Sequence, residues 1–426
     1  MASVESRAER LSARFPGLDV PAIQKGVHRN IKKLVLSLDG RYLDLLDLMN
    51  FTKNRGQSPV LSPENVHKHY SLSDNITLNG IYLHQYLSEQ GYDPVVVQNY
   101  ALANLPGLLE ERPLAVCIST NFIFWDDVKD MAARIKDLDP QVPVIAGGML
   151  VKRLLDPGEN LGHKTSNSLA RFFGNVDVFV VEAQGEQTLA KVLGALKQGG
   201  DLEGIPNLGL FDKAGNLRFT PRQAEDLPMD RTAIAWDRIP RPYLRKTLAV
   251  NTSRGCYYRC RFCTFHWLFP QVQYKSLDVL KQELGLINGL GFVEHVRFTD
   301  DNFTARKERL KQVLGMMVRE KFDFTWSSYA RASALTPELV KLMKDAGCEF
   351  VYMGIESGSQ KILDNMDKKQ TRDQAMAAIR MLNDHGIYCR GSFIVGYPGE
   401  TRETFLETVD LINKSGLPYY TPYIYS

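Results

Sequence analysis

The sequence has few of the features that mark membrane, secreted or nucleic-acid-binding proteins. No apolar run approaches the roughly 18 residues that a membrane span requires. The N-terminus, MASVESRAERLSARFPGLDV, has no apolar core of the kind that a secretion signal carries. No long basic block occurs and the formal net charge is +3, so a nucleic-acid partner is not expected. We therefore expect no membrane partner and a cytoplasmic location.

Cysteine is also scarce, with six in 426 residues. That number is too small for a disulfide framework and indicates a reducing compartment. Three of the six stand in apolar segments and are expected to be buried, inert thiols: Cys117, Cys348 and Cys389. The other three fall within eight residues, which makes this short stretch the most informative part of the chain. The length suggests two or three domains.

Residues 31–205 alternate short apolar runs with amphipathic helical stretches. The runs are KKLVLSL, PVVVQNY, LAVCIST, VPVIAGGML and VDVFVV. Near-continuous apolar strands between amphipathic helices predict an α/β, Rossmann-like, doubly wound parallel sheet. Ligands of such sheets bind at the carboxyl ends of the strands. Residues 1–30 are expected to form a helical extension, and 39–74 an excursion over the ligand face or an extra subdomain.

The second half of the chain repeats a strand–helix unit about every 30 residues. Residues 206–245 are rich in Pro and Asp and are predicted to be a linker. Residues 246–426 then give six strands and five helices, which predicts a partial (β/α)6 TIM-like barrel. The sixth strand has no helix after it, so we expect the sequence to stop before the complete fold does.

The cysteine cluster has the spacing Cys256-x3-Cys260-x2-Cys263 and directly follows the first barrel strand. Three thiolates can hold an iron–sulfur cluster, which normally takes four ligands, and one iron then keeps an open site. The alternative is a zinc ion held by these cysteines and His266. The position at the carboxyl end of a barrel strand, where barrel enzymes carry out their chemistry, favours the iron–sulfur cluster.

This cysteine spacing after the first strand of a βα barrel resembles the radical SAM superfamily. The resemblance implies a [4Fe-4S] cluster whose open iron binds S-adenosylmethionine and cleaves it to a 5′-deoxyadenosyl radical. It also implies roles for other strand-end residues. Asp300 and Asp301, in place of the common Gly-Gly-Glu, would accept from the methionine ammonium, and Arg331 would pair the carboxylate. Further cofactor contacts would come from Phe262 beside the cluster and adenine, Glu356 and Ser357 at the ribose, and Gly396 at the adenine.

A doubly wound domain before such a barrel resembles the cobalamin-binding subgroup of the same superfamily. The resemblance implies that corrin and its nucleotide tail contact this domain through Asn79, Ser119, Thr120, Gly147, Gly148, Gly185 and Glu186. The Asp-x-His-x-x-Gly motif, whose His ligates cobalt in many cobalamin proteins, is absent. The alternative is a Rossmann-like domain that binds no ligand or binds the substrate.

The two resemblances together imply a cobalamin-dependent radical SAM methyltransferase acting on an unactivated carbon of a small-molecule or peptide substrate. A reducing partner such as flavodoxin or ferredoxin is expected. No general acid or base can be assigned. Two alternatives remain: a radical SAM enzyme of another reaction type, such as cyclisation or rearrangement, and a non-catalytic cobalamin or iron–sulfur sensor. Methylthiolation is disfavoured, because the N-terminal half contains only one cysteine, Cys117.

Overall fold

The computed structural model describes residues 36–38, 41–43, 78–97, 104–121, 123, 125–155, 173–225 and 227–425. The predicted extension 1–30 and most of the excursion 39–74 lie outside these residues. Among the helices that the structure describes, none is both long and apolar enough to span a membrane.

The N-terminal sheet has five strands in the order β3-β4-β5-β6-β7. β3 (Val116–Ser119), β4 (Val144–Gly147) and β5 (Val178–Val180) are parallel, as predicted. β6 (Leu208–Phe211) and β7 (Leu217–Phe219) add an antiparallel hairpin beside β5. The hairpin lies inside the segment 206–245, which was predicted to be a linker. The sheet therefore extends further along the chain than its Pro- and Asp-rich composition indicates.

Two other predicted strands differ from the structure. The run KKLVLSL was expected to begin the parallel sheet, but its end forms β1 (Leu36–Leu38), which pairs antiparallel with β2 (Arg41–Leu43). That pair is a separate two-stranded sheet. The described part of PVVVQNY, residues 94–97, forms no strand.

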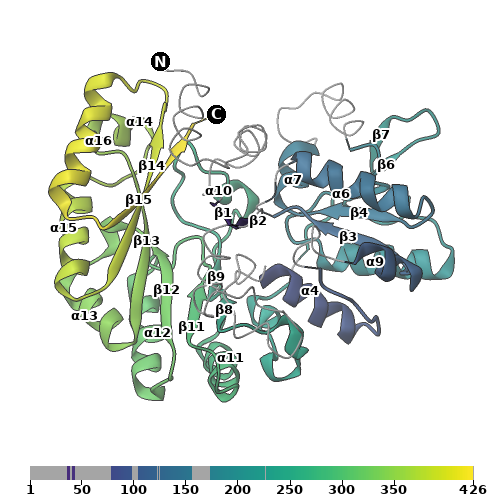
Figure 1. Cartoon of the computed structure of the whole chain (residues 1–426), viewed down its shortest axis with the longest axis horizontal. Coiled ribbons are helices and arrows are strands. Elements are labelled where there is room, and N and C mark those ends of the chain that lie inside the picture. The colour runs from purple at the N-terminus through teal and green to yellow at the C-terminus, as the bar shows by residue number, and fades with distance from the viewer. Residues whose placement is uncertain are drawn as a thin grey trace. The chain divides into compact units, whose positions relative to one another are not determined.

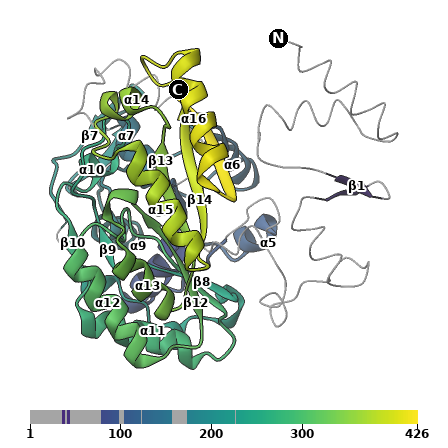
Figure 2. The same cartoon turned by 90° about the vertical axis from the view of Figure 1, so that its left-hand side faces the viewer.

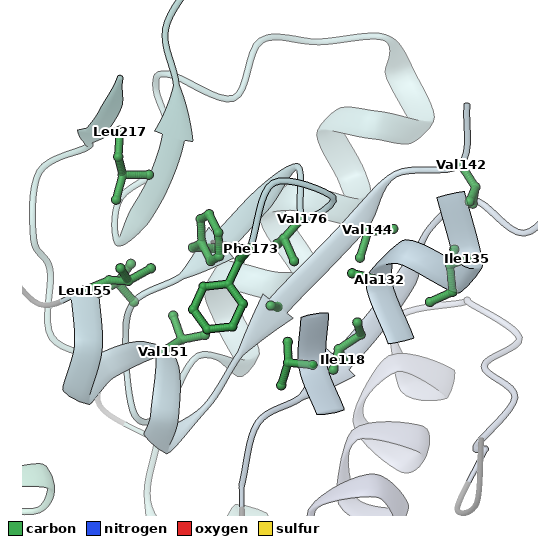
Figure 3. Close-up of a cluster of buried hydrophobic side chains, with 14 of the residues drawn as sticks. Ile118, Ala132, Ile135, Val142, Val144, Val151, Leu155, Phe173, Val176 and Leu217 are labelled. Atoms are coloured by element: carbon green, nitrogen blue, oxygen red, sulfur yellow. The ribbon is translucent and has the colours of Figure 1, made fainter. Parts of the chain in front are cut away.

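Helices cover both faces of the N-terminal sheet, as doubly wound packing requires. On one face, α5 (Leu105–Glu110), α6 (Trp125–Leu138) and α7 (Met149–Leu155) pack on a cluster that contains Val144, Ala146 and Phe179 (Figure 3). On the other, α4 (Leu78–Glu89) and α9 (Glu186–Gln198) pack on Ile145 and Val178. Successive strand residues enter opposite cores because side chains alternate across a strand.

The second sheet consists of six parallel strands in sequence order, β8-β11-β12-β13-β14-β15. Their bounds are β8 (Thr247–Val250), β11 (His295–Phe298), β12 (Thr325–Ala330), β13 (Cys348–Glu356), β14 (Tyr388–Val395) and β15 (Tyr419–Ile424). The connecting helices are α11 (Leu277–Gly289), α12 (Lys307–Glu320), α13 (Pro337–Asp345), α14 (Gln360–Asn365), α15 (Arg372–Asp384) and α16 (Arg402–Ser415). The predicted α/β class with a partial six-stranded barrel is confirmed.

The helices of the barrel lie on one side of its sheet, as Figures 1 and 2 both show for α12, α13, α15 and α16. Strand residues that face them are buried, such as Val351, Met353 and Cys389. Cys348 is buried as well, whereas Cys117 is exposed. Polar and aromatic side chains lie on the opposite face of the sheet.

Candidate functional site

The three clustered cysteines lie on the loop that follows β8 and contains β9 (Ser253–Arg254) and α10 (Phe265–Leu268). The Cys263 amide donates to the Cys260 carbonyl over 3.0 Å, and all three thiols are free of disulfides. Burial raises the pKa of the Cys263 thiol, and the neighbouring Cys260 and Cys256 raise it further. The ionised thiolate is therefore disfavoured unless positive charge lies beside it. The iron ions of an iron–sulfur cluster would supply that charge.

The geometry also bears on the zinc alternative. Among the described residues, no group of three His, Cys, Asp or Glu side chains is arranged to hold a single metal ion. A four-iron cluster takes each thiolate on a different iron, so its sulfur ligands need not converge on one point. The Nδ1 atom of His266 is buried and has no hydrogen-bond partner among the described residues.

Two of the thiols accept hydrogen bonds from other barrel loops. Asn302 Nδ2 donates to Cys256 Sγ over 3.8 Å, and Arg331 Nη1 donates to Cys260 Sγ over 3.7 Å. The Arg331 guanidinium also stacks 3.6 Å from the ring centroid of Tyr258 and donates to the Lys369 carbonyl. Donors aimed at cluster sulfurs are a general means of tuning an iron–sulfur centre. Sequence reasoning missed Asn302 and Tyr258.

Asp300 and Asp301 hold the cysteine loop in place. Asp300 is 1% exposed and accepts from the Thr252 amide, the Thr252 hydroxyl at 2.8 Å and the Ser253 hydroxyl at 2.5 Å. Asp301 accepts from the Gly255 amide at 2.7 Å. Burial raises the pKa of Asp300, and it raises the pKa of Asp301 to about 6. Both carboxyls therefore already have partners within the protein.

The remaining predicted residues at the barrel ends lie on β13, β14 and the loops after them. Glu356 pairs with Lys368 at 2.8 Å, and both side chains are almost fully buried. Glu356 has a φ of +69°, a left-handed conformation that costs energy in a residue other than glycine and often marks functional positions. Ser357 is fully buried and contacts the Thr408 hydroxyl at 3.3 Å.

Phe262 and Gly396 complete the predicted set in the barrel. Phe262 packs against a small cluster formed by Ile362, Met366 and Tyr397. Gly396 has a φ of +84°, and a Cβ there would meet no atom within 4 Å. Its amide donates to Glu400 Oε2 over 2.6 Å. The backbone at this strand end is therefore approachable.

In the N-terminal domain, the predicted residues gather at the carboxyl edge of the sheet. Ser119 and Gly147 are register partners on β3 and β4, and the Asn79 amide donates to the Ser119 hydroxyl over 2.8 Å. Thr120 is buried and its hydroxyl donates to the Gly147 carbonyl. The edge has the composition that a polar ligand tail requires, but these side chains bond to one another.

The glycines of this edge allow close packing. A Cβ on Gly148, whose φ is +116°, would lie 2.7 Å from Asn121 Oδ1, and one on Gly185 would lie 2.5 Å from Val180 Cγ1. Glu186 follows Gly185 at the start of α9. Its Oε2 is buried without a hydrogen-bond partner among the described residues, and burial raises its pKa. Glu186 is thus a buried polar group of this edge that still offers a bonding atom.

Comparison with known proteins agrees with this geometry. Residues 250–412 match the family model described as the radical SAM superfamily. An uncharacterized methyltransferase of Pyrococcus horikoshii is 31% identical over 56% of this chain and 53% of its own length. The chain spans about half the length of the curated relatives that it matches.

Two solved structures share the fold over most of the chain. One is the radical S-adenosylmethionine methyltransferase TsrM of Kitasatospora setae, with a TM-score of 0.66, 19% identity and coverage of 84% of this chain and 71% of that chain. The other is the cobalamin-dependent S-adenosylmethionine radical enzyme OxsB, with a TM-score of 0.61, 20% identity and coverage of 80% and 51%. Residues 250–412 of the barrel are thus similar to the radical SAM superfamily, and the chain shares its overall fold with these two solved enzymes.

Proposed function

We propose that this chain is a cobalamin-dependent radical SAM methyltransferase that acts on an unactivated carbon of a small-molecule or peptide substrate. The observation that carries the proposal is the Cys256-Cys260-Cys263 loop after β8, which residues at the carboxyl ends of β11 and β12 contact. The fold shared with TsrM and OxsB supports the cobalamin part.

The chain's own residues would divide the work as follows. Cys256, Cys260 and Cys263 would hold a [4Fe-4S] cluster, and Asn302 and Arg331 would direct N–H groups at two of its sulfurs. When bound, the cluster and S-adenosylmethionine would supply a substrate-activating radical, and cobalamin would supply the methyl group.

The residues at the other strand ends would bind S-adenosylmethionine. Glu356 and the backbone at Gly396 would contact its ribose and adenine, with Phe262 packed nearby. Ser357, Asp300 and Asp301 have hydrogen-bond partners within the protein. We propose that they position the residues that contact S-adenosylmethionine and do not contact it themselves. A one-electron donor such as flavodoxin or ferredoxin would be needed, as available in a reducing cytoplasm.

In the N-terminal domain, the carboxyl edge of the sheet would bind the nucleotide tail of cobalamin. The polar groups would come from Asn79, Ser119 and Glu186. Gly148 and Gly185 would let the loops that carry these groups pack closely on Asn121 and Val180, where no larger residue fits.

Anaerobic reconstitution with iron, sulfide and hydroxocobalamin tests the proposal. We expect a broad absorption band near about 400 nm, as iron–sulfur proteins show. Cys256→Ala should abolish it, whereas Cys117→Ala, the same change at a cysteine outside the cluster, should not. The corrin should remain bound after desalting, and transfer of labelled methyl groups from S-adenosylmethionine to candidate substrates should require both cofactors.

The outcomes separate the alternatives. Colourless protein that retains one zinc would overturn the radical mechanism altogether. A protein that keeps the cluster but releases all corrin would instead be a radical SAM enzyme of another reaction type. Protein that binds both cofactors and cleaves no S-adenosylmethionine after reduction would be a sensor.

A further inference from the structure

The face of the barrel sheet opposite the helices has a continuous row of aromatic and basic side chains. The strand register pairs Tyr329 with Tyr352, Tyr352 with Arg390, and Arg390 with Tyr419, across β12, β13, β14 and β15. Cross-strand partners point to the same face of a sheet, so these four side chains form one row. On β12, β13 and β14 the alternating neighbours are buried, among them Ala330, Val351, Met353 and Cys389.

The aromatic rings of this face pack on one another and on two guanidinium groups. The ring centroids of Tyr329 and Tyr352 are 5.3 Å apart, and those of Phe350 and Tyr352 are 4.8 Å apart. The Arg390 guanidinium carbon lies 5.9 Å from the Tyr352 ring centroid, and that of Arg297 lies 4.9 Å away. The rings nevertheless stay open, with Tyr329 40% exposed and Tyr419 47% exposed.

The charge of this face is positive. Arg297 Nη2 donates to the Tyr329 hydroxyl over 2.7 Å. Among the described residues, no carboxylate forms an ion pair with Arg390. The one acid further along β13, Glu356, is paired with Lys368. An anion that reached Arg390 would therefore meet a guanidinium that packs on aromatic rings and pairs with no carboxylate in the described part of the chain.

The next row toward the carboxyl ends contains only small side chains: Gly354, Ser392 and Thr421 are register partners. It lies two residues further along each strand, about 7 Å away at 3.3 Å per residue. Glu356 stands two residues beyond it. The side chains of Glu356 and Lys368 lie over Gly354, so a molecule anchored at the aromatic row would extend past Ser392 and Thr421 toward the strand ends.

We propose that the substrate is a planar aromatic or conjugated carboxylic acid, whose ring packs on Tyr329, Tyr352 and Tyr419 and whose carboxylate pairs with Arg390. The inference rests on the proposed function for the role of substrate, whereas binding itself depends only on these residues. A guanidinium favours a carboxylate through paired N–H donors, and tyrosine rings favour planar π-systems. The carbon to be modified lies at the end of the molecule away from the carboxylate.

The test uses 2-naphthoate as the probe and its neutral isostere 2-naphthamide as the comparison, with the reconstituted full chain in equilibrium dialysis. We expect 2-naphthoate to bind at least tenfold more tightly than the amide. Arg390→Gln should abolish that difference, and Arg390→Lys should restore part of it. Arg380→Gln removes the same charge from an exposed position on α15 and should leave binding unchanged.

Three results would overturn the inference: equal binding of the acid and the amide, binding of the acid that Arg390→Gln leaves unchanged, or no binding of either compound at millimolar concentration. Iron content and corrin retention are measured on the same samples. Arg390-dependent binding by a chain that holds neither cofactor would refute the proposed function and leave the anion site standing. Full cofactor loading without Arg390-dependent binding would refute the anion site and leave the proposed function standing.

Discussion

The variant Asp300→Ala tests how the cysteine loop is held in place. The carboxylate accepts from one amide and two hydroxyls of Thr252 and Ser253 at 1% exposure. A buried donor left without a partner costs about 1–3 kcal/mol. The amide is rigid and should cost about 2 kcal/mol, and each hydroxyl, which can rotate, should cost about half as much.

Part of this loss of stability is offset by a second effect of the substitution. Burial raises the pKa of Asp300, which means that the ionised form is penalised in the fold, and the alanine removes that penalty. Of the gross loss of about 4 kcal/mol, we expect about 2 kcal/mol to remain. For a domain of the barrel's size this lowers Tm by about 4–8 °C. Because Thr252 and Ser253 lead directly into Cys256, iron content after anaerobic reconstitution should fall as well.

Asp300→Asn is the matched control, since it keeps the shape and one acceptor oxygen. It should retain most of the stability and most of the iron. Thermal melting and iron analysis of the three proteins decide the question. An Asp300→Ala protein with the Tm and iron content of the parent, but without affinity for S-adenosylmethionine, would refute the structural role. It would favour instead the predicted role as acceptor for the methionine ammonium.

Three further predictions concern other buried groups. Lys368→Met should destabilise the barrel by about 3–5 kcal/mol in thermal melting, because Glu356 would be left buried and unpaired; an unchanged Tm would refute a buried ion pair. Glu186→Gln, melted without corrin, should raise Tm more at pH 8 than at pH 5. Burial raises the pKa of the Glu186 carboxyl, so the ionised form destabilises the fold only at pH values above the pKa of this group in the unfolded chain. Equal shifts of Tm at both pH values would contradict this. Gly185→Ala should cost about 1–3 kcal/mol and weaken corrin retention, because its Cβ would lie 2.5 Å from a strand valine, whereas Gly194→Ala in α9 meets no atom closer than 3.8 Å and should be tolerated.

The barrel could be predicted from the sequence because each of its units repeats the same local signals. Thr371 and Thr401 form capping boxes at the starts of α15 and α16, and Gly416 ends α16 with a φ of +71°. Such signals act over a few residues and survive without knowledge of the tertiary fold. The apolar runs between these signals then predict buried parallel strands.

The β6–β7 hairpin was missed because its composition resembles that of a linker. A local signal was nevertheless present: Asp212 caps the turn by accepting from the amides of Ala214 and Asn216, and Gly215 has a φ of +75°. An Asp and a Gly three residues apart between two short apolar runs are typical of such a turn. The pair of β1 with β2 carried a signal as well, because the sequence between Leu38 and Arg41 is Asp-Gly, a dipeptide typical of two-residue hairpin turns.

The partners of the site residues could not be predicted, because they depend on register between distant strands. Val250 pairs with Phe298, and this register is what places Asp300 beside Thr252, 48 residues away in sequence. A sequence shows that acidic residues follow a strand, but it does not show whether they point toward a ligand or toward the neighbouring loop. Predictions of chemistry at strand ends are therefore safer than predictions of individual contacts.

The cysteine loop shows why so many polar groups around a cofactor site bond within the protein. Lys275 is fully buried beside this loop, where it pairs with Glu283 at 2.6 Å and donates to Asn251 at 3.2 Å. Its amide donates to the Thr252 carbonyl, so the pair anchors the same segment that Asp300 holds. A loop positioned by charges and hydrogen bonds keeps its thiols in place without an apolar core, which three sulfur ligands and a charged cluster would disrupt. We conclude that the buried acidic residues and Lys275 form their hydrogen bonds within the protein, and that these bonds position the loop that carries the three thiols.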